Sequence, residues 1–129
     1  MTRRLFAANL PVIFANLLAI FLFVASPAIA HHGWSWTTGG NIDLTGLITS
    51  VQLGNPHGVL KVDVEGEEWT VEVGQPWRNE RAGLKDGDLA EGVEIRVVGE
   101  PSTDQAQKLV KAETMYIGDQ EYVLYPGRD

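Results

Sequence analysis

The sequence predicts an all-β domain with small helical content: an OB-like closed barrel of five or six strands and one short helix, preceded by a cleavable signal helix. Apolar and polar residues alternate in three separate segments, 60–64, 69–73 and 93–97, which is typical of half-buried strands. A single helical segment follows the third expected strand, which is the order of an OB-like barrel. A β-sandwich is the alternative, although about six strands and one mid-chain helix fit it less well.

Residues 1–30 have the three parts of a secretory signal peptide. Two arginines give a positive start, residues 12–25 are mostly apolar, and an A-x-A cleavage site ends at Ala30. Cleavage there predicts a periplasmic protein whose first residue is His31. The alternative is an uncleaved anchor, because the apolar run is about long enough to cross a bilayer. In that case the protein contacts the membrane only through its leader.

The first part of the exported chain predicts an arm and one long strand. Residues 31–40 are rich in aromatic residues and glycine without a clear period, so they predict an N-terminal arm, and residues 41–129 then form the barrel. In the segment 41–53, apolar residues stand at both even and odd positions, so both faces of the expected strand carry apolar side chains. We call these two alternating sets of positions the phases of the strand. Gly46 stands where these phases overlap, which suits a bent strand of a small barrel.

The remaining elements follow in order along the chain. Gly66 predicts a tight turn between the strands 60–64 and 69–73, and Pro76 favours the first turn of a helix over 76–82. Further strands are expected at 93–97, 109–117 and 121–125. The residues predicted to face the barrel interior are Leu60, Val62, Trp69, Val71, Val93, Ile95 and Val97. We expect the side chains of Trp34 and Trp36 to pack against the barrel and fix the arm to it. The side chain of Trp77 is expected to plug one end of the barrel by filling it.

Charge and composition exclude several classes of function. Ten basic residues less Arg3 and Arg4 of the leader leave eight against 17 acidic ones, a net charge of −9. Such a domain repels the phosphates of nucleic acids and anionic lipid headgroups, so cations are its more natural small partners. The chain has no cysteine, which excludes disulfides, thiolate metal sites and a lipoprotein anchor.

Several short motifs occur in a fixed order. His31-His32 follows the signal segment, Asn55-Pro56-His57 ends the first strand, a Trp-x-x-Glu strand runs from Trp69 to Glu72, and a Leu-Lys-x-Gly-Asp turn ends at Asp88. This ordered set resembles an uncharacterised family of small secreted bacterial proteins with a mature N-terminal His-His pair and an Asn-Pro-His motif. The resemblance implies an envelope location and a barrel, but no established activity.

The histidines point to a metal site. An N-terminal histidine offers its α-amine, of ordinary pKa about 7.7–8.0, together with its ring, of ordinary pKa about 6.5. We expect His31, His32, His57 and Glu72 to hold a transition metal, with the ring nitrogens roughly 3–4 Å apart. Glu72 is assigned to the outward phase of its strand as an oxygen ligand or as a support for an imidazole. Nitrogen donors without thiolate favour Cu²⁺.

Less specific interpretations remain open. The two N-terminal histidines can be a solvated tail, with His57 capping a loop. The protein is then a metal-free interaction module that binds an envelope protein or a small ligand through its barrel face. An enzyme is not expected, because the sequence has no nucleophile elbow, no phosphate loop and no His-Glu-x-x-His motif. A subunit of an enzyme would need partner residues that this chain lacks.

Overall fold

The computed structural model describes residues 33–128, so the predicted signal segment 1–30 and the His31-His32 pair lie outside the described residues. The elements are β1 (Ile42–Gln52), β2 (Val59–Val64), β3 (Glu67–Glu72), α2 (Pro76–Arg81), β4 (Glu94–Pro101), β5 (Leu109–Ile117) and β6 (Gln120–Val123). No helix in this range is long and apolar enough to cross a membrane.

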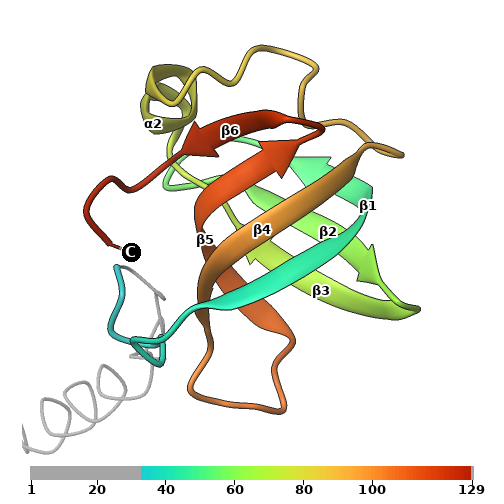
Figure 1. The fold of residues 1–129 in the computed structure, drawn as a ribbon. Helices are drawn as coiled ribbons and strands as arrows, with labels where there is room; N and C mark the ends of the chain where they lie inside the picture. The colour runs from blue at the N-terminus through green and yellow to red at the C-terminus, as the bar shows by residue number, and fades with distance from the viewer. Residues whose placement is uncertain (1–32, 129) are drawn as a thin grey trace, which may run out of the picture. The chain divides into compact units, whose positions relative to one another are not determined.

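Five strands close into a barrel, and β6 is an additional strand that pairs antiparallel with β5 (Figure 1). The antiparallel order β3-β2-β1-β4-β5 is completed by a parallel pairing of β3 with β5, in which Thr70 lies opposite Leu109 and Glu72 opposite Lys111. The short helix lies between β3 and β4 in the chain. The predicted OB-like closed barrel is therefore confirmed.

The predicted inward residues form much of the core. Leu60, Val62, Val71, Ile95 and Val97 are each at most 2% exposed, while Trp69 and Val93 are half-buried and pack against them. The core is completed by residues from β1, β5 and the C-terminal segment, among them Ile48, Val110, Met115 and Leu124. Alternation predicted these strands because only one face of each looks into the barrel.

Strand β1 bends where its two apolar phases meet. A Cβ atom on Gly46 would lie 2.2 Å from the carbonyl oxygen of Asp63, so only glycine allows β2 to approach this closely. The pairing with β2 shifts register between Ile48 and Ser50. Beyond this shift Val51 packs against the core like Ile48 before it, whereas Leu47 is 48% exposed.

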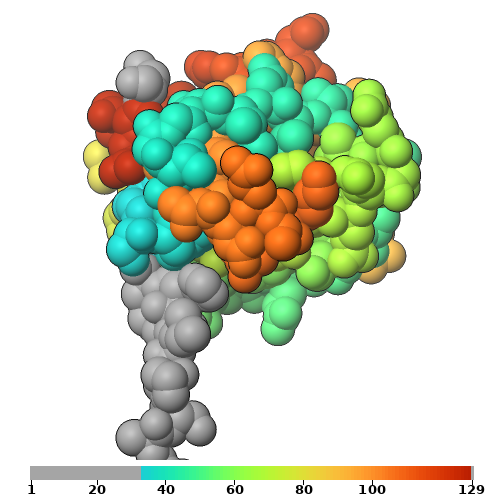
Figure 2. Space-filling view, turned by 90° about the horizontal axis from the view of Figure 1, so that it is seen from below, coloured from blue at the N-terminus to red at the C-terminus, as the bar shows by residue number. Residues whose placement is uncertain are grey.

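Tryptophans fasten the N-terminal arm, as predicted. Trp36 is buried, and its carbonyl accepts a hydrogen bond of 3.0 Å from the Thr103 backbone N–H. Trp34 packs edge-on against Tyr125 with ring centroids 4.9 Å apart. In Figure 2 the loop 102–108, in orange, covers this end of the barrel beside the arm.

The helix α2 begins at Pro76 as expected, and Gly83, with φ +101°, follows its end. The prediction that Trp77 plugs a barrel end is wrong, because its side chain is 52% exposed. Its ring instead lies beside the guanidinium of Arg78, 4.5 Å from the ring centroid. Leu84 and Leu89, which follow the helix, join the core in its place.

Candidate functional site

The loop after β1 holds His57 against the end of β3. The backbone N–H of Gly58 donates to the Gly74 carbonyl at 3.1 Å, and the Val73 N–H donates to the Gly58 carbonyl at 2.9 Å. A Cβ on Gly58 would lie 2.6 Å from a methyl group of Val73, so glycine allows this close approach. The loop is thereby pinned next to Glu72, the last residue of β3.

A backbone contact favours one of the two ring nitrogens of His57 as the proton carrier of the neutral imidazole. Nδ1 lies 3.2 Å from the Gly58 carbonyl oxygen, which can only accept a hydrogen bond. Nδ1 is therefore the donor, and Nε2 keeps its lone pair. That lone pair is on the atom that faces Glu72, with 3.7 Å between Nε2 and Oε1.

Glu72 is buried, at 6% exposure. Alternation does assign it to the outer face of β3, because Val71 and Val73 on either side are in the core. That outer face is covered because β3 pairs with β5, whose Lys111 places its Nζ 3.9 Å from Glu72 Oε2. The two carboxylate oxygens thus face different partners, a histidine and a lysine.

Lys111 is a buried residue of this candidate site that the sequence patterns did not single out. Its Nζ donates to the Gly33 carbonyl oxygen at 3.0 Å and lies 4.9 Å from the centroid of the Trp34 ring. Burial lowers the pKa of Lys111, and the negative charge of Glu72 opposes that effect. A charged residue between Val110 and Ala112, in a strand with irregular alternation, was the available signal.

Aromatic rings and cations cover this part of the barrel. Arg78 lies over the Tyr125 ring at 4.2 Å, and Arg128 lies over the Trp34 ring at 3.7 Å from its centroid. Each ring face thus carries a cation of the chain itself, a favourable arrangement when it is partly desolvated. These contacts join the arm, the helix and the C-terminal residues around Lys111.

The structure brings together two of the four predicted ligands. His57 and Glu72 meet, while His31 and His32 lie outside the described residues, so the four-residue site stays a prediction. Within residues 33–128 no three histidine or carboxylate side chains gather in a way that could hold a metal ion. A metal site with three or more such ligands therefore needs donors beyond the described residues in addition to the pair His57 and Glu72.

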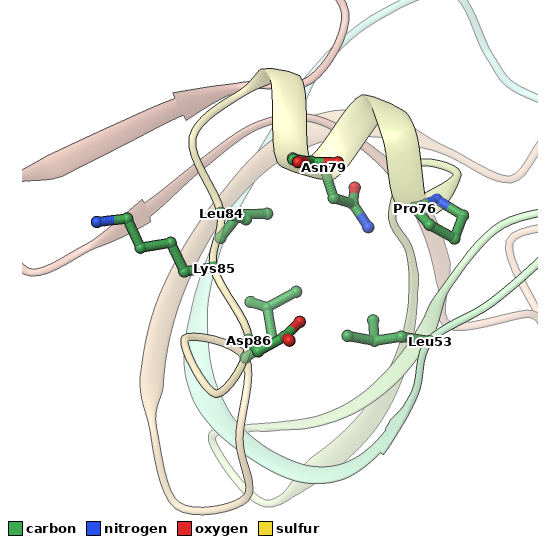
Figure 3. A pocket seen from close by; sticks show the side chains of 8 residues that line it. Leu53, Pro76, Asn79, Leu84, Lys85 and Asp86 are labelled. Carbon is green, nitrogen blue, oxygen red and sulfur yellow. The ribbon is translucent and has the colours of Figure 1, made fainter.

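A second feature is a hollow of about 460 Å³ beside α2 (Figure 3). Leu53 and Leu84 point into it from opposite sides, and Asn79 points into it from the helix, whereas Lys85 points away. Leu53 is 51% exposed. The hollow is thus lined by apolar and polar residues in equal number, with the carboxylates of Glu80 and Asp86 among them.

Comparisons with known proteins give a family and a set of distant structures. A model described as a family of unknown function (DUF6152) matches residues 19–111. No curated protein matches the sequence. Among solved structures, a ZRD-deleted mutant of TiaS in complex with agmatine is 16% identical, with a TM-score of 0.46 over 60% of this chain and 21% of that one. A complex of TiaS with a transfer RNA, AMPCPP and agmatine gives the same identity and TM-score over 18% of its length. The chain spans about a fifth of the length of these proteins.

Proposed function

The chain belongs to DUF6152, a family of unknown function, and we propose that it is a periplasmic β-barrel protein that binds a transition metal ion, Cu²⁺ above all, as a carrier, buffer or sensor. His57 and Glu72 supply two ligands from the barrel. His31 and His32 supply the others, after the leader has been cleaved behind Ala30. The protein is then a binding protein rather than an enzyme.

The observation that carries the proposal is the geometry of His57. Histidines that ligate metals almost always donate their other ring N–H to a carbonyl or carboxylate, as Nδ1 of His57 does toward Gly58. The distance of 3.7 Å between Nε2 and Glu72 Oε1 is too long for a hydrogen bond. It fits two ligands of one ion, which are about 3–4 Å apart when each bond is about 2.0–2.2 Å long.

Chain connectivity supports the contribution of the N-terminal histidines. The carbonyl of Gly33 is held by Lys111 Nζ, and the same Nζ lies 3.9 Å from Glu72 Oε2. His32 is the residue directly before Gly33. Gly33 is thus held beside Glu72, which supports the assignment of the two preceding residues, His31 and His32, as the remaining ligands.

Titration of Cu²⁺ into matched proteins tests this function. The protein that starts at His31 is compared with the same protein carrying one extra N-terminal Met, and with His57→Ala and Glu72→Gln. The added Met converts the α-amine of His31 to an amide, whose proton is far less acidic. Loss of a ligand or of its support commonly costs about 10–100-fold in affinity, so all three altered proteins should bind Cu²⁺ at least about tenfold more weakly.

Glu68→Gln is the matched control for Glu72→Gln. Glu68 is on the same strand, but its side chain is 65% exposed and pairs with Lys61 at 3.4 Å. This variant should bind Cu²⁺ like the parent, and thermal unfolding checks that each variant is folded. Equal affinity in all of the proteins would contradict the metal function.

The hollow beside α2 favours one other function, a metal-free interaction module for a small ligand or an envelope protein. Its volume of about 460 Å³ is within the range of ligand pockets, about 300–1,000 Å³. Titration with 1-hexanol, followed by methyl NMR, tests for a ligand site. The methyl groups of Leu53, Leu84 and Leu89 should shift saturably while those of Val110, in the core, stay unchanged. Uniform small shifts would exclude a specific site there.

A further inference from the structure

Two carboxyl groups are buried side by side where the arm and the C-terminal residues meet the barrel. Glu100, at the end of β4, is 4% exposed, and Glu113, on β5, is 3% exposed. The pairing of β4 with β5 shifts register between Val98 and Gly99, so Glu113 is an extra residue between the partners of these two. Such a bulge redirects side chains, and it lets Glu113 share surroundings with Glu100.

Groups of residues 37–41 bind both carboxyls. Oε2 of Glu100 accepts hydrogen bonds from the Thr37 hydroxyl and, at 3.0 Å, from the Gly39 N–H. Oε2 of Glu113 accepts a hydrogen bond of 2.8 Å from the side-chain amide of Asn41. Two arm residues, and Asn41 directly after the arm, thus depend on two acidic side chains of neighbouring strands.

One guanidinium group bridges the remaining oxygens. Arg128 donates from a terminal nitrogen to Glu100 Oε1 at 2.8 Å, and its Nε lies 3.5 Å from Glu113 Oε1. The same guanidinium stacks on the ring of Trp34, at 3.7 Å. Figure 1 shows the C-terminal segment, in red, ending beside the arm. The carboxyl pair therefore holds both ends of the described chain.

The balance of charge around the pair requires a proton. Two ionised carboxyls beside one guanidinium would leave an uncompensated buried negative charge. Lys111, the partner of Glu100 across the strands, directs its Nζ to Gly33 and Glu72 instead. Within residues 33–128, Oε1 of Glu113 is a buried oxygen without a hydrogen bond. A proton on this oxygen would remove the excess charge and provide a donor.

We propose that Glu100 and Glu113 hold one proton between them and form a pH-sensitive clasp that fastens residues 37–41 and Arg128 to the barrel. The clasp goes beyond metal binding, and none of the proposed ligands belongs to it. A hollow lined by Glu113, Tyr125 and the exposed Glu121 gives protons a path from solvent. Glu121 is not part of the clasp, since its carboxylate accepts the Tyr116 hydroxyl at 2.8 Å.

The pKa shifts of the two groups have opposite signs. Burial, together with the neighbouring Glu100, raises the pKa of Glu113 above its ordinary value. Burial also acts to raise the pKa of Glu100, but hydrogen bonds from Thr37, Arg128 and Gly39 outweigh it and lower that pKa. The contribution of Glu113 to stability is lost as pH rises through its raised pKa. That of Glu100 is lost as pH falls through its lowered pKa, so the clasp is tightest between the two.

Hydrogen exchange of the Gly39 amide tests the clasp, because this N–H donates to Glu100. In the full chain, the protection factor of Gly39 should fall by about tenfold or more as pH rises through the pKa of Glu113. Glu113→Gln cannot lose a proton there, so its Gly39 protection should stay constant over the same pH range. Glu121→Gln, which borders the same hollow, should behave like the parent.

The ¹³C resonance of the Glu113 carboxyl, followed against pH in the unaltered protein, provides a measurement that does not depend on any variant folding. Titration above the ordinary range of glutamate supports the shared proton. Titration at or below that range overturns the clasp, and so does a Gly39 protection profile that Glu113→Gln leaves unchanged.

Discussion

Lys111 is a cation in a place where burial disfavours charge. Its side chain is 6% exposed, and the cost of burying the ammonium group is offset by the Gly33 carbonyl, by the carboxylate of Glu72 and by the faces of two aromatic rings. Because one amino group makes all of these contacts, Lys111 links β5 to the arm and to the end of β3.

Replacing Lys111 by Met should therefore destabilise the fold strongly. Removing one partner of a buried ion pair leaves the other charge without compensation, and the free energy of unfolding typically falls by about 3–5 kcal/mol. Urea denaturation measures the loss. Lys108→Met is the control, since Lys108 pairs with Glu67 at 3.2 Å on the surface and should contribute less than about 1 kcal/mol. Similar losses in both variants would contradict the role of Lys111.

Sequence patterns predicted part of the site and missed part of it. The pairing of His57 with Glu72 was expected from the Asn-Pro-His motif and the strand phase, and the structure brings the two side chains together. The burial of Glu72 could not be predicted, because alternation states only which face of a strand a residue occupies. The residue that covers that face, here Lys111, comes from a distant part of the chain. A single sequence does not show which distant residues pair.

At the scale of the element, strand β4 depends on a glycine at its bulge. A Cβ on Gly99 would lie 2.0 Å from the carbonyl oxygen of Lys111, so the two strands would have to separate. Gly99→Ala should lower the free energy of unfolding by about 1–3 kcal/mol or more, as overpacking does. Gly40→Ala is the matched control, because no atom lies within 4 Å of its added Cβ. Denaturation curves that coincide for the two variants would show that the bulge tolerates a side chain.

Strands β1 and β4 are also joined by an ion pair on the surface. Arg96 donates to both carboxylate oxygens of Asp43, with the shortest contact at 2.6 Å, and this hydrogen bonding lowers the pKa of Asp43. The contribution of this group to stability is therefore present above the ordinary pKa of aspartate, and it is lost as pH falls through the lowered pKa.

Arg96→Met should return the pKa of Asp43 toward its ordinary value, because the hydrogen bonds that lower it are gone. A carboxyl NMR titration measures this change directly. Lys61→Met, which removes an exposed pair on β2 and β3, should leave the titration of Asp43 where it is. An unchanged pKa of Asp43 in Arg96→Met would rule out the ion pair as the cause of the shift.

For the whole molecule, the order of the elements along the chain could be predicted, but the strand pairing that closes the barrel could not. Alternation and turn residues predicted the extents of most strands, and β5 lies at 109–117 as expected. The barrel is closed by three parallel partners between β3 and β5, two strands that are far apart in the sequence. No local pattern encodes such a register, since it depends on how the helix and β4, which lie between the two strands in the chain, pack.

The acidic charge of the molecule predicts that it does not bind nucleic acid, although its barrel is OB-like. With 17 acidic and 10 basic residues in the chain, the repulsion of phosphates is strongest at low ionic strength. Fluorescence anisotropy of a labelled single-stranded oligonucleotide in about 50 mM salt should show no binding. Binding that weakens as salt is raised would contradict this expectation.

Both ends of the described chain, residues 33 and 128, lie near the same carboxyl pair. The order in which the strands are joined along the chain can therefore be changed. The guanidinium of Arg128 stacks on Trp34, so a short flexible linker can join residue 128 to residue 33, and new ends can be opened in the exposed turn at Gly87. Such a circular permutant should unfold cooperatively like the parent, as circular dichroism against temperature would reveal. It would keep His57 and Glu72 but lack His31 and His32. Copper titration of this folded permutant then separates the contribution of the barrel to the Cu²⁺ affinity from the contribution of the N-terminal histidines.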